Sequence, residues 1–89
     1  MYRVELTPRA RRELDTVPAR DFQRVDRAIL GLMENSRPPG VRKLRGSIYR
    51  LRTGRWRIIY AVLDTEQVVI VGKVARRAED TYDQLEELF

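Results

Sequence analysis

The chain has 89 residues, 43% of them hydrophobic and 35% charged, and it contains neither cysteine nor histidine. These totals predict one small globular domain over residues 1–89 and exclude a disulfide framework, a Cys/His zinc site and a histidine-based triad. Catalysis would therefore depend on arginine, lysine, tyrosine or carboxylate side chains, and no cofactor is expected. No apolar run approaches the roughly 20 residues that cross a bilayer. The N-terminus also lacks the apolar stretch of a signal peptide, so we expect a cytoplasmic protein without a membrane partner.

The net charge of +5 is not spread evenly along the chain. The segment from Ser36 to Leu63 carries eight basic residues and no acidic one, whereas the remainder carries ten basic and thirteen acidic residues. The eight are Arg37, Arg42, Lys43, Arg45, Arg50, Arg52, Arg55 and Arg57. Such a concentration is typical of a phosphate-binding surface. Arginine supplies 16 of the 18 basic residues, which suits phosphate recognition, although GC-rich codon usage would favour arginine as well.

The first third of the chain predicts a strand followed by two helices. Residues Tyr2–Leu6 alternate between apolar and charged side chains, which is the period of a half-buried strand. Thr7 is a candidate N-cap for a helix over Pro8–Asp15, because proline suits the first helical position. Val17-Pro18 ends that helix. A second helix is expected over Ala19–Asn35, with an apolar face and an arginine-rich opposite face, and the short join makes the two a helical hairpin.

Three strands are expected after a loop rich in proline. Their ranges are Ser47–Arg52, Arg55–Leu63 and Gln67–Val74. Their connections are short enough for antiparallel hairpins. Glu79–Phe89 has apolar residues near helical spacing and predicts a short C-terminal helix. The order β-α-α-β-β-β, with this final helix, indicates an α+β domain in which a helical hairpin packs on one face of a small, mostly antiparallel sheet.

The hairpin around Thr53-Gly54 sorts its side chains by chemistry. A two-residue turn there would pair Arg52 with Arg55 and Arg50 with Arg57, which places all four arginines on one face. The other face would hold the apolar side chains that cover the helices, namely Tyr49, Leu51, Trp56, Ile58 and Tyr60. Stacked like charges are unfavourable, so we interpret the arginine face as a polyanion-binding surface; a solvated face with splayed arginines is the alternative. A three-residue loop would change the pairs but would keep Arg50 with Arg52, and Arg55 with Arg57, on one side.

Three consecutive motifs carry a resemblance to a known family. They are Lys43 to Gly46, Tyr49 to Arg52, and Gly54 to Tyr60, followed by the valine-rich stretch Val68–Val74, the pair Arg76-Arg77, and Tyr82. In this order they closely resemble the core of the RelE/ParE superfamily of toxins from bacterial and archaeal toxin–antitoxin systems, and they favour its RelE-like branch. The family's β-α-α-β-β-β order is also the order expected above.

The resemblance implies a growth-arresting toxin that is neutralised by a cognate antitoxin protein. RelE-like members enter the ribosome and cut messenger RNA without a metal, by attack of the 2′-OH on the adjacent phosphate, so an endoribonuclease that inhibits translation is implied. ParE-like members instead inhibit DNA gyrase, which is the first alternative. The second is a catalytically weak relative that only binds its antitoxin, because a basic face would also dock an acidic segment of that partner.

The resemblance also assigns roles to individual residues. The implied catalytic residues are Arg50, Arg52, Arg57, Arg76 and Tyr82, and further RNA-binding charge is expected from Lys43, Arg45, Arg55 and Arg77, with Lys43 and Arg45 in a loop. Relatives often have lysine at the positions of Arg50 and Arg52, and a histidine where Ala75 stands. Arginine hardly deprotonates, so it would clamp a phosphorane-like transition state but carry no proton. Acid–base work would then fall to Tyr82, whose pKa nearby arginines would lower.

Structural roles compete with several of these assignments. Tyr82 would also suit the core of the last helix. Arg76 and Arg77 would also suit a cap on the sheet or ion pairs with Glu79 and Asp80. Trp56 is expected in the core rather than as a platform for base stacking. The segment from Ala78 to Phe89 carries five acidic residues and no basic one. It is either an ordinary solvated helix face or a segment that lies near the basic block and competes weakly with RNA.

Overall fold

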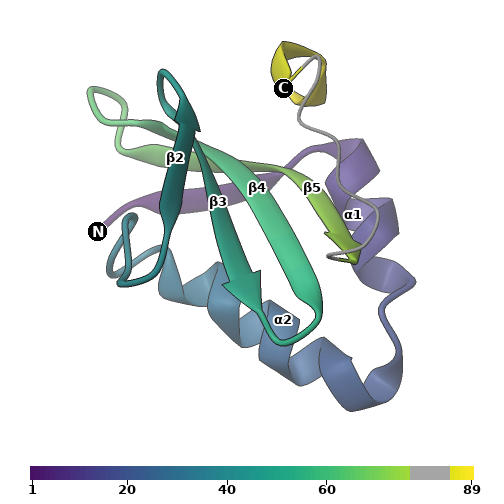
Figure 1. The fold of residues 1–89 in the computed structure, drawn as a ribbon. Helices are drawn as coiled ribbons and strands as arrows, with labels where there is room; N and C mark the ends of the chain where they lie inside the picture. The colour runs from purple at the N-terminus through teal and green to yellow at the C-terminus, as the bar shows by residue number, and fades with distance from the viewer. Residues whose placement is uncertain (77–84) are drawn as a thin grey trace.

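The computed structural model describes residues 1–76 and 85–89 and contains two α-helices beside a five-stranded sheet (Figure 1). The bounds are β1 Arg3–Leu6, α1 Pro8–Asp15, α2 Ala19–Gly31, β2 Arg42–Arg45, β3 Ile48–Thr53, β4 Trp56–Leu63 and β5 Val68–Arg76, with a 3-10 helix at Leu85–Leu88. The strands follow the order β1-β5-β4-β3-β2 across the sheet. β1 runs parallel to β5, and the other three neighbouring pairs are antiparallel. The predicted α+β class is confirmed.

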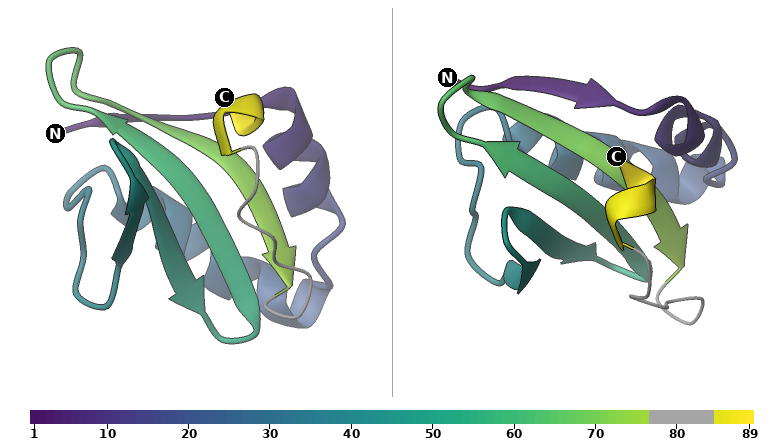
Figure 2. Two further views of the ribbon diagram at one scale, coloured as in Figure 1. Left: turned by 45° about the horizontal axis from the view of Figure 1, so that its top comes forward. Right: turned by 90° about the horizontal axis from the view of Figure 1, so that it is seen from above.

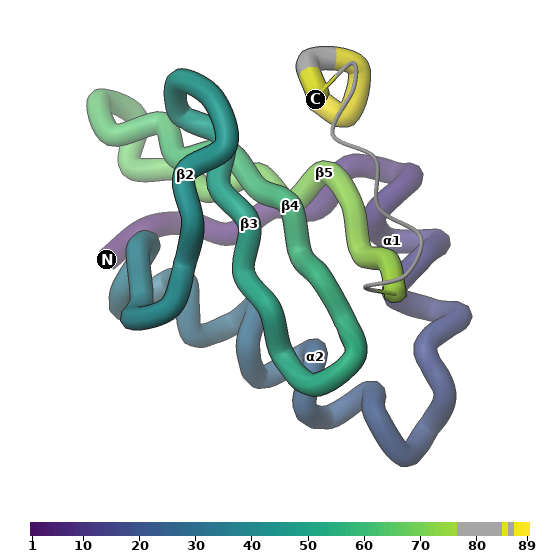
Figure 3. The backbone as a smooth tube through the Cα atoms, in the orientation of Figure 1, coloured from purple at the N-terminus to yellow at the C-terminus, as the bar shows by residue number. Residues whose placement is uncertain are grey.

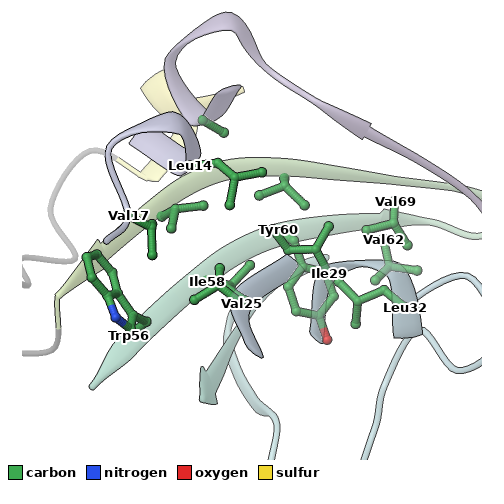
Figure 4. Close-up of a cluster of buried hydrophobic side chains, with 13 residues drawn as sticks. Leu14, Val17, Val25, Ile29, Leu32, Trp56, Ile58, Tyr60, Val62 and Val69 are labelled. Carbon is green, nitrogen blue, oxygen red and sulfur yellow. The ribbon is translucent and has the colours of Figure 1, made fainter. Parts of the chain in front are cut away.

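Both helices pack on one face of the sheet and bury the main hydrophobic core against it (Figure 2). Every second residue of β4 from Trp56 to Val62 belongs to this core, as the alternation of a strand requires. The core side chains drawn in Figure 4 include Leu14, Val17, Val25, Ile29, Leu32, Ile58, Tyr60 and Val69. Because this apolar area is removed from water, it is the main stabilising contribution on the helix side of the sheet.

The start of α1 follows the predicted chemistry. The Thr7 side chain accepts a hydrogen bond from the backbone N–H of Ala10 at 3.1 Å, and Pro8 occupies the first turn, where its missing N–H costs nothing. The helix then runs over Pro8–Asp15, the range expected from the sequence. The prediction for this helix is therefore confirmed at both ends.

The second helix is shorter than expected, since α2 ends at Gly31 rather than at Asn35. Glycine is a weak helix former, and the chain beyond it turns so that the Met33 carbonyl accepts a hydrogen bond from the Tyr2 N–H at 3.0 Å. This bond ties the end of the helix to the residue before β1. No helix in the described part of the chain is long and apolar enough to span a bilayer.

The turn between β3 and β4 lies one residue further along than expected. Thr53 pairs with Trp56 and Arg52 with Arg57, so the two turn residues are Gly54 and Arg55, not Thr53 and Gly54. Gly54 has a φ of +59°, and the first central position of a type II′ turn demands such a residue. The shift moves each partner by two residues, which leaves the faces of both strands unchanged. The predicted pairs were wrong, and the predicted separation of apolar from basic side chains on these strands is confirmed.

The segment before β3 is a strand rather than a loop. Arg42–Arg45 forms the edge strand β2, which pairs with β3 through Arg42 opposite Arg50 and Lys43 opposite Tyr49, with an irregularity before Arg45. The prediction of a loop at Lys43 and Arg45 was therefore wrong. A short, highly charged edge strand is a common device against edge-to-edge aggregation, and its sequence lacks the alternation that would reveal it.

The C-terminal residues Leu85–Phe89 pack on the face of the sheet opposite the helices (Figure 2). Leu85 is buried there in a second, smaller cluster with Ile48, Ile59 and Ala61. Phe89 lies so close to Gly72 that a β-carbon at Gly72 would fall 2.7 Å from its ring. The predicted helix over Glu79–Phe89 lies outside the described residues up to position 84, and Leu85–Leu88 is a 3-10 helix.

A polar network fixes the loop that follows α2. The Arg37 guanidinium forms a salt bridge with Asp64 at 2.8 Å, and its Nε donates a hydrogen bond to the Tyr49 hydroxyl at 2.9 Å. The interaction with Arg37, together with a hydrogen bond donated by the Tyr2 hydroxyl, holds the pKa of the Asp64 carboxyl below its usual value. The buried Tyr60 hydroxyl donates to the Ser36 carbonyl at 2.8 Å, and burial raises the pKa of this phenol. The network ties the loop to β3, β4 and the turn after β4.

Candidate nucleic-acid interface

The face of the sheet opposite the helices collects arginines from three strands. β2 contributes Arg42 and Arg45, β3 contributes Arg50 and Arg52, and β4 contributes Arg57. Strand pairing places them together, since Arg42 is opposite Arg50 and Arg52 is opposite Arg57, and directly opposed residues share a face. We call these five residues the outer arginine face.

The outer arginine face combines buried and exposed charges. Arg50 and Arg57 expose only 7% and 4% of their surface, whereas Arg52 between them is exposed. Arginine stays charged at physiological pH even when it is buried. Two positive charges held away from water act on an approaching anion more strongly than the same charges in solvent, because the local dielectric constant is lower. The centre of this face therefore carries two buried guanidinium groups next to the exposed Arg52.

These arginines are also engaged within the protein. Arg45, Arg50, Arg52 and Arg57 each make a further polar or electrostatic interaction. None of these four side chains is therefore without a partner before a ligand binds. A phosphate ligand would exchange some of these interactions for its own oxygens.

Three of the predicted site residues lie elsewhere. Lys43 is opposite Tyr49 and so lies on the helix side of β2, and Arg55 is exposed in the β3–β4 turn. Arg76 is opposite Trp56, and its guanidinium carbon lies 5.3 Å from the centre of the Trp56 ring. Because directly paired residues share a face, Arg76 lies with Trp56 on the helix side of the sheet, and Arg57 lies on the outer side. The prediction that Arg55 shares one face with Arg50, Arg52 and Arg57 was wrong, because Arg55 is a residue of the turn.

A bulge in β5 explains the position of Arg76. Ile59 is opposite Lys73 and Tyr60 is opposite Val71, so Gly72 is an extra residue on β5. An extra residue reverses which side chains point to the core, which is why Val71 and Val74 are both in the main cluster. Without the bulge, the residue at position 76 would share the face of Arg57. The sequence signal for this feature is a glycine inside a valine-rich strand.

Arg76 instead borders a cleft of about 520 Å³ between α1 and the end of β5. Its lining is mixed in charge, because Glu13 accepts a hydrogen bond from the Val74 N–H at 2.8 Å and pairs with Lys73 at 3.4 Å. Trp56 lines the cleft and belongs to the main core, and its indole N–H donates a hydrogen bond to Asp21 at 3.0 Å. The prediction that Trp56 is a core residue is confirmed.

Two predicted residues, Arg77 and Tyr82, lie outside the described part of the chain. Conversely, the sequence-based assignment of site residues omitted Arg42, which the register places beside Arg50. The available signal was its membership of the basic block, which becomes specific only when β2 is recognised as a strand. Within residues 1–76 and 85–89, no group of three acidic side chains is placed to hold a metal ion.

The chemistry available on the outer arginine face is electrostatic. Guanidinium groups donate paired hydrogen bonds to phosphate oxygens and stabilise charge that develops on them. They do not accept or release protons near neutral pH, so a reaction on this face needs another group for proton transfer. The face is therefore suited to bind and polarise a phosphodiester.

Comparison with known proteins gives a consistent match over nearly the whole chain. Residues 4–81 match the family model described as the ParE toxin of the type II toxin–antitoxin system parDE. A curated relative from Methanocaldococcus jannaschii, named as toxin RelE1, is 30% identical over 81 residues, which are 85% of this chain and 90% of the relative.

Solved structures of similar proteins share the fold. The toxin of an archaeal RelE–RelB complex from Pyrococcus horikoshii is 27% identical, with a TM-score of 0.79 over 89% of this chain and 98% of its own. The toxin of the intact E. coli RelBE toxin–antitoxin complex is 26% identical, with a TM-score of 0.72 over 85% of this chain and 96% of its own. The sequence comparisons and the shared fold therefore point to the same group of similar proteins.

Proposed function

The chain belongs to the RelE-like branch of the RelE/ParE superfamily of type II toxins, and from this premise we propose that it cuts messenger RNA on the ribosome. The observation that carries the proposal is the outer arginine face, where Arg50 and Arg57 are buried beside the exposed Arg52. Fixed cations at the centre of a sheet suit a reaction whose transition state gains negative charge on phosphate oxygens. Cleavage in this way would arrest translation in the cytoplasm.

The proposed step is attack of a ribose 2′-OH on the adjacent phosphorus. The bond from the 2′-oxygen to phosphorus forms, the bond from phosphorus to the 5′-oxygen breaks, and the products are a 2′,3′-cyclic phosphate and a 5′-hydroxyl. The proton of the 2′-OH leaves to a base, and the 5′-oxygen gains one. Arg57 and Arg50 stabilise the phosphorane-like transition state, Arg52 binds a neighbouring phosphate, and Tyr82 is our candidate for proton transfer.

The partner of the toxin in this proposal is a cognate antitoxin protein. The similar solved structures from P. horikoshii and E. coli are complexes of a toxin with its antitoxin. The outer arginine face would attract acidic side chains of such a partner by the same electrostatics that attract RNA. An antitoxin bound there would block access to messenger RNA.

A second candidate function is inhibition of DNA gyrase. It is favoured by the match of residues 4–81 to a model named for ParE toxins. A gyrase inhibitor needs a binding surface but no group that stabilises a phosphorane-like transition state. The two candidates therefore differ in what happens to messenger RNA when the protein is induced.

The proposal is tested by inducing the protein in cells and mapping messenger RNA 5′ ends by primer extension. We expect new ends inside translated codons, with a loss of about 10²- to 10³-fold in cleavage for Arg57→Ala, because it removes a cation from the transition state. Arg52→Ala provides a second test at an exposed position, and Arg11→Ala on the outside of α1 is the matched control. Intact messenger RNA together with gyrase-linked DNA breaks would refute the nuclease and support the alternative.

A further inference from the structure

A second basic surface lies on the helix side of the molecule, away from the outer arginine face. Arg20, Arg24 and Arg27 are exposed on α2 at spacings of four and three residues, which places them on the same side of the helix. Val25 and Ile29 on the opposite side are buried in the main core. The three guanidinium groups therefore extend from a rigidly packed helix into solvent, along about 10 Å of its axis at 1.5 Å per residue.

The β3–β4 turn brings a fourth charge to this row. Two adjoining hollows of about 320 and 460 Å³ share Arg20 and Arg24, and the smaller one is also lined by Gly54 and Arg55. A β-carbon at Gly54 would fall 2.6 Å from Nη1 of Arg24, so the glycine leaves room for this guanidinium to rest on the turn. Figures 1 and 3 show the turn beside α2. We call Arg20, Arg24, Arg27 and Arg55 the α2 ridge.

The charges of the α2 ridge are not balanced within the described residues. None of its four arginines forms an ion pair with any carboxylate side chain that the structure describes. The helix carries two acids, Asp21 and Asp26, and Asp21 accepts the hydrogen bond of the Trp56 indole. Like charges at i and i+4 destabilise a helix. A surface that keeps them is suited to a polyanion.

The lining of the ridge indicates which polyanion it binds. Guanidinium groups match phosphate oxygens in paired hydrogen bonds. Proteins that bind single strands add aromatic side chains on which bases stack, and no described residue that lines the two hollows is aromatic. Recognition through the backbone alone is typical of double-stranded RNA.

We propose that the α2 ridge binds the phosphate backbone of folded, double-stranded RNA. This rests on the proposed function in one respect: a toxin that acts on messenger RNA held in a large RNA assembly would gain affinity from a second RNA contact. The β3–β4 turn separates the ridge from Arg52 and Arg57, which pair next to the turn on the other face. Duplex RNA on the ridge and a single strand on the outer arginine face would therefore contact opposite sides of one hairpin.

The test compares two triple variants that lose the same charge from different helices. One is Arg20→Gln, Arg24→Gln and Arg27→Gln on α2, and the matched control is Arg9→Gln, Arg11→Gln and Arg12→Gln, all exposed on α1. Affinity for a fluorescent blunt RNA duplex of about 16 base pairs is measured by anisotropy at several KCl concentrations. For the α2 variant we expect a loss of about tenfold or more at 0.1 M KCl and a fall of about 2 to 3 in the salt slope.

The α1 control should retain duplex affinity within about twofold. A six-nucleotide single strand should bind the wild type and both triple variants with similar affinity. Equal losses in both triple variants would mean that only net charge matters and would overturn the proposal. Unchanged duplex affinity in the α2 variant would also overturn it. The same holds if the α2 variant loses affinity only for an acidic peptide and not for the duplex. The melting temperature of each variant, or Arg27→Gln alone where the triple variant unfolds, separates binding from folding. Because duplex binding is measured without ribosomes, its outcome is independent of whether the protein cuts messenger RNA.

Discussion

The two faces of the sheet are formed by the same strands but have different roles. On the helix side, alternate residues of β4 such as Ile58 and Tyr60 are completely buried by two helices. On the outer side, Ile59 and Ala61 belong to a small cluster that the C-terminal residues cover, and Arg57 lies at the end of the same row. One face holds the fold together, and the other carries charge next to a modest apolar patch. Variants that separate these roles test the comparison.

The largest difference in stability is expected between variants at two adjacent isoleucines of β4. Ile58→Ala should lower the free energy of unfolding by about 4 to 5 kcal/mol, because the cavity it leaves is enclosed by the main core. Ile59→Ala should cost about 2 to 3 kcal/mol, because the smaller cluster has room to collapse around the gap. Urea unfolding of both variants measures the difference. Equal losses would mean that the outer cluster supports the fold as much as the main core does.

A smaller effect is expected where the C-terminal residues contact the bulge of β5. Gly72→Ala should cost about 1 to 3 kcal/mol or displace the C-terminal residues, because its β-carbon would fall 2.7 Å from the Phe89 ring and 2.8 Å from the Leu88 carbonyl. Amide exchange of Leu85–Phe89 should then become faster. Gly31→Ala is the control, since a β-carbon there has no neighbour within 4 Å. Unchanged exchange in Gly72→Ala would contradict the close packing described for this face.

The smallest effect is expected far from both faces, in the turn after β4. The Arg37 hydrogen bond lowers the pKa of Asp64 from its ordinary value of 3.8. The stability gained from this carboxylate is therefore fully present above pH 4 and is lost as the pH falls through the lower, folded value. Asp64→Asn should be slightly less stable than the wild type at neutral pH and equally stable in strong acid. Glu66→Gln in the same exposed turn is the control, and a stability gap that widens on acidification would contradict this sign.

The sequence predicted the elements well because their periodicity is local. The N-cap at Thr7 and the alternation of β4 needed no tertiary information. The side of each arginine in β3 and β4 was also predictable, since it depends on a period of two and not on the exact turn. The five-residue outer arginine face was foreseen in part for this reason.

The remaining errors arise from interactions that local patterns do not contain. β2 exists because it pairs with β3, and Gly54 rather than Thr53 begins the turn because only the glycine tolerates a positive φ. The bulge at Gly72 moved Arg76 to the helix side, where it lies over Trp56. A bulge and an edge strand are set by neighbouring strands, so a single sequence shows them only as a glycine and a run of charges.

The central claim is that the outer arginine face, and not the protein's charge in general, binds single-stranded RNA. The direct measurement is the salt dependence of affinity for a six-nucleotide RNA in Arg52→Ala, Arg57→Ala and the control Arg11→Ala. Each of the first two should reduce the salt slope by about 1 and weaken binding, because each removes one phosphate contact, and the control should leave the slope unchanged. The same slope in all three variants as in the wild type would contradict the claim.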